Sequence, residues 1–463
     1  MTGGTAGRRG SCPGLVIAAP ASGSGKTTLT LGLLRCLAGR GVAVASAKAG
    51  PDYIDPAFHA AASGRPCLNL DPWAMRRETL GRAAGRLMED AALIVCEGVM
   101  GMFDGALVGP RDNDRGDDGS TASLAGLTGW PVVLVVDASA QGASAAAVVK
   151  GFAGFRPGVG VAGVVFNRVG GERHAAILKD ACRRALPDVP VLGCLPRAEG
   201  VALPERHLGL VQAGEHADLD SFLDRAAELV AGHLDIDALV ALAKPLSAGL
   251  AGGASPAPPV PPPIPPLGQR IAVARDAAFA FSYPLVIEGW REAGAEIVPF
   301  SPLADHAPDP AADAVYLPGG YPELHGGRLA AARGFLEGLR ARVKAGAALY
   351  GECGGYMTLG QGLADGDDNR HAMAGLLPLE TSFAQPKLHL GYRRARTIAA
   401  GPLGAAGARF RGHEFHYANV VAEGPGEPLF ETADAEGRSL GPAGRRAGRV
   451  FGSFVHLIDR ERD

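Results

Sequence analysis

The sequence predicts an α/β protein with two domains, each built around a parallel sheet. Short apolar runs rich in Val, Ile and Leu alternate with Ala- and Leu-rich stretches typical of helices. These runs lack the alternation of polar and apolar residues that marks a half-exposed strand, so we expect strands that are buried on both faces. A proline-rich segment, residues 247–268, separates two such series. Because proline cannot continue a helix or a central strand, we expect an extended linker there.

The first domain is expected to span residues 14–246, after a flexible tail at residues 1–13, and the second to span residues 269–463. The expected strands of the first domain are 15–19, 42–46, 93–97, 132–137, 161–167 and 191–196. Those of the second domain are 270–276, 296–300, 314–320 and 347–352, with a late buried strand at 451–457. Strands that alternate with helices in this way predict a sheet covered on both faces.

The composition excludes several classes of protein. A chain of 463 residues is long enough for two domains, and its net charge of −3 does not favour a nucleic-acid-binding surface. No apolar stretch reaches the roughly 18 residues that span a membrane. The N-terminal residues do not form a secretion signal, and the seven scattered cysteines suggest neither a disulfide framework nor a zinc site. We therefore expect a cytoplasmic protein with no nucleic-acid or membrane partner.

The stretch "APASGSGKTTLTLGLLRCL", residues 19–37, predicts a phosphate-binding loop. It follows the first strand and opens a helix, whose positive N-terminal end favours an anion. Lys26 can reach the β- and γ-phosphates of ATP, and Thr27 can place a hydroxyl on Mg²⁺. Pro20 stands where this motif usually has its first glycine. The expected nucleotide ligands of the loop are Gly23, Ser24, Gly25, Lys26, Thr27 and Thr28.

Polar residues also follow other strands of the first domain, at the edge where open α/β sheets bind ligands. Glu97 ends the strand in "LIVCE", and "KAGPDYIDP" at 48–56 offers Lys48 and two acids at the same edge. Asn167, in "FNRV", is a candidate for the nucleotide base, with capping of the strand end as the alternative. The expected metal ligands are Thr27, Asp52 and Glu97, and the expected substrate contacts are Tyr53, Ile54, Asp55 and Asp104. For each of these acids, the alternative to a binding role is a carboxylate that is merely exposed to solvent. For the loop at residues 51–56, the alternative is a tight turn that has no role in binding.

The second domain carries a cysteine on a sharp turn, in "GECGG" at 351–355. A strand, then Gly-x-Cys-x-Gly, then a helix predicts a nucleophile elbow with Cys353 as nucleophile. The helix N-terminus is expected to lower the pKa of the thiol. His456, in "FGSFVHL", is the expected base. The backbone N–H groups expected to stabilise an oxyanion belong to Gly319, Gly320 and Gly354.

These residues carry a resemblance. The second domain resembles the class I glutamine amidotransferases, which have a flavodoxin-like fold and use cysteine and histidine to release ammonia from glutamine. That family usually has glutamate two residues after the histidine, where this chain has Ile458, followed by Asp459. Glu414, in "GHEFHY", is the substitute we consider for orienting His456.

From about residue 14 to 458 the chain resembles the cobyrinate and hydrogenobyrinate a,c-diamide synthases. The resemblance rests on "SGSGKTTLTLGLLRCL", "KAGPDYIDPAFH", "CEGVMGMFDG", "LPERHLGL" at 203–210, "GGYPE", "GECGGYM" and "GHEFHY". The first domain also resembles dethiobiotin synthetase. The resemblance implies amidation of two carboxylates of a corrinoid in cobalamin biosynthesis, with ATP and glutamine as co-substrates and Mg²⁺ as cofactor.

Two alternatives stay open at this point. Cobyric acid synthase shares both domain types but amidates four other side chains, and a ParA-like switch would carry an inactive amidotransferase domain. The presence of both Cys353 and His456 speaks against the second alternative. The sequence leaves open whether the ring carries cobalt, which carboxylate reacts first, and the oligomeric state, with a homodimer as one option.

Overall fold

The structure is a computed structural model that describes residues 12–109, 116–198, 200–201, 211–216, 218–251 and 260–461. Its described residues fall into two compact units. The first unit holds most of the chain before residue 252, and the second holds the chain from residue 260 onward together with Ala74–Thr79 and residues 106–109. The predicted tail up to residue 11 and the "LPERHLGL" stretch at 203–210 lie outside the described residues.

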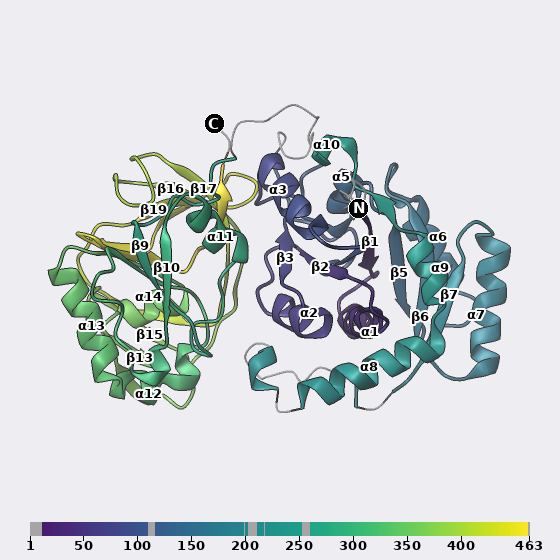
Figure 1. Cartoon of the computed structure of the whole chain (residues 1–463), viewed down its shortest axis with the longest axis horizontal. Coiled ribbons are helices and arrows are strands. Elements are labelled where there is room, and N and C mark those ends of the chain that lie inside the picture. Colours follow the sequence, from purple (N-terminus) through teal and green to yellow (C-terminus); the bar gives the residue numbers. More distant parts are fainter. Residues whose placement is uncertain are drawn as a thin grey trace, which may run out of the picture. The chain divides into compact units, whose positions relative to one another are not determined.

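The first unit is built on a parallel sheet in the strand order β3-β2-β4-β1-β5-β6-β7, with β8 antiparallel to β1 (Figure 1). The strands are β1 Pro13–Ala18, β2 Val44–Ala49, β3 Cys67–Leu70, β4 Leu93–Glu97, β5 Val132–Asp137, β6 Val161–Val169, β7 Val191–Pro196 and β8 Lys244–Pro245. Strands β1 to β5 are almost wholly buried, in keeping with their apolar runs, whereas β6 and β7 are buried over part of their length. The parallel sheet is confirmed, while β3 and β8 are strands that the sequence did not predict.

Helices cover both faces of this sheet: in Figure 1, α1, α2 and α8 lie on one side of it, and α3 and α5 on the other. The helices are α1 Lys26–Gly39, α2 Asp55–Ser63, α3 Arg77–Met88, α5 Thr121–Thr128, α6 Ala145–Phe155, α7 Glu172–Ala185, α8 Leu219–His233, α9 Ile236–Ala241 and α10 Ala248–Ala251, with a 3-10 turn, η1, at Ala213–Glu215. Helix α1 packs against α2 and α8. None of the described helices combines the length and the hydropathy that a membrane-spanning segment needs.

The second unit has a central sheet in the order β10-β9-β11-β12-β22-β21, parallel except for β21. Its strands are β9 Arg270–Ala274, β10 Glu296–Phe300, β11 Ala314–Leu317, β12 Ala348–Glu352, β21 Arg445–Ala447 and β22 Val450–Ser453. Its helices are α11 Pro284–Glu292, α12 Gly326–Ala331, α13 Arg333–Lys344 and α14 Gly354–Leu359, with 3-10 turns η2 Pro302–Ala304 and η3 Pro322–His325.

Two further sheets of this unit did not appear in the sequence prediction. One has the order β14-β13-β15-β18 and the other, all antiparallel, has the order β20-β19-β16-β17-β23. Their strands are β13 Gly362–Ala364, β14 Arg370–Ala372, β15 Leu379–Ser382, β16 His389–Thr397, β17 Arg409–His416, β18 Asn419–Glu423, β19 Phe430–Ala433, β20 Ser439–Ala443 and β23 His456–Arg460. Several are short and half exposed, so they lack a continuous apolar run.

The prediction of one buried strand at 451–457 is wrong. The chain leaves the central sheet after Ser453 at the end of β22, passes through Phe454 and Val455, and enters the antiparallel sheet at His456. His456 therefore stands at the first position of β23, where its neighbour across the sheet is His413 of β17. The switch between sheets brings His456 to the side of the β12 strand end, because β22 pairs with β12.

The structure describes residues 247–251 and 260–268 of the segment predicted to be an extended linker. Neither part is simply an extended, exposed chain. Residues 248–251 form α10, which is possible because the run of prolines begins only after them. Near the other end, Ile264 and Leu267 are buried, and the Ile264 carbonyl accepts a hydrogen bond from Trp290 Nε1 at 3.1 Å. The described part from residue 260 onward is therefore packed into the second unit.

Candidate active sites

The phosphate-binding loop of the first unit has the backbone that its glycines predict. Gly23 and Gly25 have φ values of 75° and 93°, in the left-handed region that favours glycine. A side chain at Gly25 would also collide with Asn167, whose Nδ2 donates to the Ser24 carbonyl at 3.0 Å. Helix α1 begins directly after this turn, at Lys26. Asn167, near the end of β6, therefore stabilises the position of the loop.

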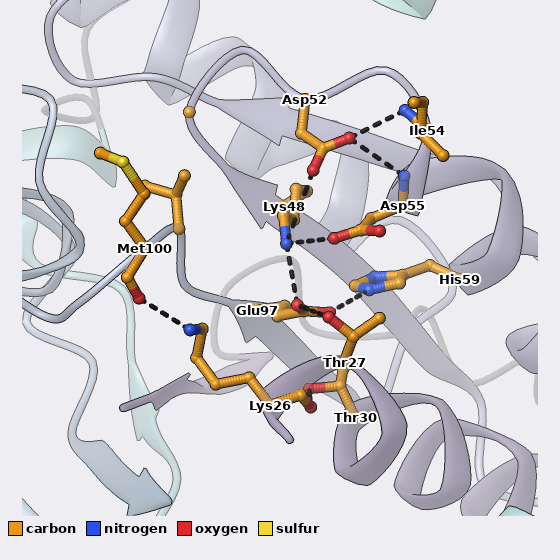
Figure 2. A network of polar contacts seen from close by, with 12 residues as sticks. Lys26, Thr27, Thr30, Lys48, Asp52, Ile54, Asp55, His59, Glu97 and Met100 are labelled. Atoms are coloured by element: carbon orange, nitrogen blue, oxygen red, sulfur yellow. Dashed lines mark hydrogen bonds and ion pairs between the residues drawn. The ribbon is translucent and has the colours of Figure 1, made fainter. Parts of the chain in front are cut away.

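A network of polar side chains lies beside this loop and centres on Glu97, which is fully buried (Figure 2). Lys48 and Glu97 are in register on adjacent strands β2 and β4, and Lys48 Nζ lies 2.8 Å from Glu97 Oε1. The Thr27 hydroxyl donates to the same oxygen at 2.6 Å, and His59 Nε2 lies 2.7 Å from Oε2. Lys48 also contacts Asp55 at 2.5 Å. Asp55 and His59 are one helical turn apart on α2, so both face this network.

The charges of this network compensate one another. Burial alone would raise the pKa of Glu97, but the Lys48 ammonium and the His59 contact hold it well below its ordinary value. Burial opposes charge on Lys48, yet Asp55 and Glu97 raise its pKa well above the ordinary value. Burial likewise opposes charge on His59, but Cys67 and Glu97 raise its pKa to about 10. At neutral pH, an ionised Glu97 is thus flanked by two cations.

Lys26, the lysine of the phosphate-binding loop, does not share the contacts of Lys48 with Glu97 and Asp55. Its Nζ donates to the Met100 carbonyl at 2.7 Å, on the loop that follows β4. Met100 has a φ of 46°, an uncommon value for a residue with a side chain. Burial lowers the pKa of Lys26. The ammonium is therefore held by one neutral carbonyl, which an anionic phosphate can readily replace.

The remaining predicted residues of this unit lie close to the network. Asp52 Oδ1 accepts hydrogen bonds from the backbone N–H groups of Ile54 and Asp55 at 2.8 and 3.0 Å, and its other oxygen is 3.8 Å from Lys48. Burial and the neighbouring Asp52 raise the pKa of Asp55 to about 7. Tyr53 and Ile54 are buried. The loop is thus a closed turn that caps α2, with Asp52 as its partly exposed acid.

Asp104 has a local role in the structure: its Oδ2 accepts from the Gly101 backbone N–H at 2.9 Å and so shapes the loop after β4. A cavity of about 440 Å³ is lined in part by the phosphate-binding loop and the start of α1. It is lined by residues that include Gly25, Thr28, Asn167, Arg168, Pro196 and Arg197. The cavity lies at the carboxyl ends of β6 and β7, where a nucleotide base would follow phosphates held by the loop.

The oxygen atoms near Thr27 fit a Mg²⁺ ion that is bound mainly by the phosphates of a nucleotide and only in part by the protein. Among the described residues, no three His, Cys, Asp or Glu side chains are grouped as a ready-made metal site. The Thr27 hydroxyl and the Glu97 carboxylate nevertheless lie 2.6 Å apart. Asp52 is near them, because its carboxylate lies 3.8 Å from Lys48, the lysine that also contacts Glu97. Hydroxyl and carboxylate oxygens are the protein ligands that Mg²⁺ combines with phosphate oxygens and water.

The second site lies where β12 ends in the second unit. Cys353 has φ 46° and ψ −104°, a strained conformation between β12 and α14, and its backbone N–H donates to the Ser453 carbonyl at 2.8 Å. A Cβ added to Gly319 would be 3.2 Å from His456 Nε2 and 3.4 Å from the Cys353 Cβ. The cysteine and the histidine therefore border the same small space, and only glycine at position 319 leaves it open.

The two other glycines predicted to stabilise an oxyanion lie at the same turn. A Cβ on Gly354 would lie 2.9 Å from the Gly320 nitrogen, so these two backbones are close together. A side chain at Gly320 would collide with the Ala278 carbonyl, which explains glycine there. All three predicted glycines therefore surround Cys353.

The prediction of a lowered thiol pKa is wrong for the resting site. Cys353 is buried, and burial raises its pKa far above the ordinary value. The carboxylates of Glu323, Glu414 and Glu352 add to this effect, while the Gly354 backbone N–H opposes it. The thiol is therefore protonated at rest, and its proton must be removed by a neighbouring base when a substrate is attacked.

His456 is in the state that a base requires. It is fully buried, and burial, together with His413, lowers its pKa well below the ordinary value, so the ring is neutral at neutral pH. Glu414, the residue considered for orienting the histidine, pairs elsewhere, and so does Asp459, which follows the position where the family usually has its glutamate. Glu414 contacts Arg393 at 2.6 Å, and Asp459 accepts from Arg76 Nη2 at 2.8 Å. Ile458 is a buried apolar residue.

Three polar residues of these sites were not predicted as site residues. Lys48 stood in a quoted motif, but only its register beside Glu97 shows their contact. His59 follows Asp55 by four residues, and this spacing was a signal that both side chains share a helix face. Glu352 directly precedes the cysteine, and its Oε2 lies 3.9 Å from His456 Nδ1. No sequence pattern that we considered indicated this last contact.

Comparisons with known proteins identify the family of each domain and of the whole chain. Residues 15–211 match the family model of the CobQ/CobB/MinD/ParA nucleotide binding domain, and residues 270–463 match the CobB/CobQ-like glutamine amidotransferase domain. The chain is 52% identical to hydrogenobyrinate a,c-diamide synthase of Rhizobium meliloti over 96% of this chain and 99% of the relative. It is 53% identical to the enzyme of the same name from Brucella anthropi, over 96% and 98% of the two chains. The predicted resemblance is thus confirmed, and the chain belongs to the family of hydrogenobyrinate a,c-diamide synthases.

Proposed function

We propose that this chain converts the a and c carboxylates of hydrogenobyrinate to amides, with ATP as the activating co-substrate and glutamine as the source of nitrogen. The observation that carries the proposal is the presence of two different sites in one chain. One is a phosphate-binding loop beside a Lys–Glu–His network, and the other is a cysteine–histidine pair that borders Gly319. The first suits activation of a carboxylate, and the second suits release of ammonia.

At the second site, the neutral His456 takes the proton of Cys353 as the sulfur attacks the carboxamide carbon of glutamine. The oxygen of the tetrahedral intermediate is held by backbone N–H groups of the turn formed by Gly319, Gly320 and Gly354. When the carbon–nitrogen bond breaks, the proton on His456 passes to the leaving ammonia. Water then hydrolyses the thioester, which releases glutamate and restores the thiol.

At the first site, a carboxylate oxygen of the corrinoid attacks the γ-phosphorus of ATP and forms an acyl phosphate with release of ADP. Lys26 exchanges the Met100 carbonyl for phosphate oxygens, and the nucleoside fits the cavity beside Asn167. Ammonia then attacks the carbonyl carbon of the acyl phosphate, and inorganic phosphate leaves. The result is one amide for each ATP and each glutamine consumed.

Mg²⁺ would be held by Thr27, Glu97 and Asp52, where it would neutralise charge on the transferring phosphoryl group. Lys48 is placed to assist in the same way, because its ammonium is fixed between Glu97 and Asp55. A side chain fixed in this way needs no reorganisation as charge develops on the phosphoryl group. The loop that bears Tyr53 is proposed to meet the acetate groups of the ring at this edge of the sheet.

The test supplies purified protein with ATP, Mg²⁺ and glutamine, and with either the metal-free or the cobalt-containing ring. Products are identified by mass spectrometry over the course of turnover. We expect hydrogenobyrinate to pass through a monoamide to a diamide and to stop there. No amide on either ring, or continued amidation beyond two groups on one ring, would overturn the proposal.

A further inference from the structure

The residue before the nucleophile, Glu352, is a buried carboxylate in an aromatic part of the core. Tyr316 and Tyr350 are in register on β11 and β12, and their rings stack with centroids 5.7 Å apart. Tyr350 and Glu352 are two residues apart on β12, so both side chains stand on one face of the sheet. A carboxylate in such a place costs free energy unless it is fully hydrogen-bonded.

Glu352 has the hydrogen bonds that an ionised carboxylate needs. The Tyr316 hydroxyl donates to Oε2 at 2.7 Å, and the Tyr350 hydroxyl donates to Oε1 at the same distance. The backbone N–H of Leu457 donates to Oε1 at 3.1 Å. Leu457 is the neighbour of His456, so this bond fixes the start of β23 relative to β12. Every one of these three groups donates, which favours an acceptor that carries a negative charge.

We propose that Glu352 is the positioning residue of the cysteine–histidine site: its carboxylate orients the His456 ring and balances the charge when His456 accepts the Cys353 proton. The proposal rests on the geometry. Glu352 Oε2 lies 3.9 Å from His456 Nδ1, while Nε2 faces the space over Gly319 that borders Cys353. One ring nitrogen of His456 therefore faces the carboxylate, and the other faces the space that borders Cys353. A histidine that acts as a base and is oriented by an acid requires this arrangement.

The separation of 3.9 Å is an ion-pair distance and too long for a hydrogen bond in the resting state. The resting ring is neutral, so a strong contact is not required at that stage. When the thiol proton reaches Nε2, the ring becomes a cation, and attraction to the carboxylate then favours the charged pair that glutamine cleavage needs. Other charged or titratable groups near this site, within the described part of the chain, include His413, His416, Glu414 and Glu323. This inference rests on the proposed glutaminase role of Cys353 and His456.

A pH effect follows from the ionisation of this acid. Burial raises the pKa of Glu352 to about 7, although the tyrosine hydroxyls and the Leu457 N–H oppose the rise. The positioning role needs the charged form. Glutaminase activity should therefore be lost as the pH falls through about 7 and be retained above it. His456 does not produce this limb, because burial lowers its pKa well below the ordinary value.

The decisive variant is Glu352→Gln, which keeps the size and an acceptor for Leu457 but removes the charge. We expect kcat for glutamine hydrolysis to fall by ~10²- to 10⁴-fold, the usual contribution of proton transfer by a positioned group. KM for glutamine and amidation driven by ammonium chloride should change little. Glu352→Asp, which restores the charge, should recover part of kcat. The rate of Cys353 alkylation by iodoacetamide should lose its wild-type dependence on pH near 7.

Tyr316→Phe and Tyr350→Phe provide the matched controls, because each keeps the carboxylate and removes one donor. Loss of a hydrogen bond to the charged form raises an acid's pKa, so the acid limb of the glutaminase profile should move to higher pH. If Glu352→Gln does not fold, as judged by its melting temperature, these two variants decide. An unchanged limb in both, or a folded Glu352→Gln with wild-type kcat and pH profile, would leave Glu352 a structural residue. A Cys353→Ser variant that kept glutamine-dependent activity would instead overturn the proposed function itself.

Discussion

Gly319→Ala is the substitution whose effect follows most directly from the structure. The added methyl group would occupy the space between His456 and Cys353, closer than 3.0 Å to His456 Cε1. Real Cβ atoms do not approach that closely, so the ring must move. Gly319 does not have a positive φ, and its carbonyl accepts from the Phe281 N–H at 2.9 Å, so the backbone can accept alanine. The backbone N–H at this position also remains.

The expected size of the effect can be estimated from this displacement. Relief of the contact requires the imidazole to retreat by roughly 1 Å, and a shift of that size at a reacting group costs ~10²-fold in rate. Overpacking of the buried site should also cost about 1–3 kcal/mol of unfolding free energy. Because the backbone donor is kept, the lost rate would come from the position of His456 and not from the oxyanion contact.

The assay compares amidation of the corrinoid with glutamine and with ammonium chloride, in the wild type and in the variant. Gly327→Ala is the matched control, since a Cβ there meets its nearest neighbour, in His371, at an ordinary 3.8 Å. We expect Gly319→Ala to lose ~10²-fold with glutamine only, and Gly327→Ala to lose nothing. A Gly319→Ala protein with wild-type glutamine turnover would refute the placement of His456 beside Cys353.

Three further predictions concern the rest of the molecule. Lys26→Ala and Glu97→Gln should each reduce amidation at least ~10²-fold with either nitrogen source, since we propose that both residues bind ATP or its metal before any amine is used; normal ammonia-driven turnover would remove that residue from the site. Tyr53→Ala, run to partial turnover with the monoamide identified by NMR, should change which carboxylate reacts first, and an unchanged monoamide at an unchanged rate would exclude the loop from substrate positioning. Asp459→Asn should lower the free energy of unfolding of the second unit, measured in urea, by about 1.5–3 kcal/mol, because the buried Asp459 loses its charge while the partly buried Arg76 guanidinium keeps its own; an unchanged midpoint would show that this ion pair contributes little.

The features that depend on a few neighbouring residues could be predicted from the sequence. The phosphate-binding loop and the cysteine turn are both local, because glycine is needed for the backbone and the functional side chain stands beside it. The parallel strands of the first unit were equally visible, since each is a continuous buried apolar run. These elements carry the motifs, so both sites could be placed on the fold before their contacts were known.

The contacts that complete the sites depend on residues far apart in the chain. Glu352 and Leu457 are 105 residues apart, and Arg76 and Asp459 are 383 residues apart. No local pattern indicates such pairs, and Asp459 could be mistaken for a partner of the histidine three residues before it. The structure assigns Asp459 to Arg76 and places Glu352 at the histidine instead.

The pKa of the Cys353 thiol shows a second reason why a sequence motif cannot predict every property of a site. A helix N-terminus lowers the pKa of an exposed cysteine, and the motif alone predicts that effect. Burial cannot be read from the motif, and in the structure it outweighs the Gly354 N–H at Cys353. The antiparallel sheets were missed for a related reason. Strands such as β18 are exposed along most of their length, so the apolar signal on which the prediction depended is weak there.

The central claim is that one chain releases ammonia at Cys353 and consumes it at a separate ATP-dependent site. The most direct measurement is the amidation rate of Cys353→Ser with glutamine and with ammonium chloride, under the same ATP and corrinoid concentrations. Serine keeps the shape of the buried side chain but lacks a nucleophile of comparable strength. We predict loss of the glutamine-dependent reaction and a wild-type rate with ammonium chloride. Equal loss with both nitrogen sources, or retention of the glutamine-dependent reaction, would contradict the claim.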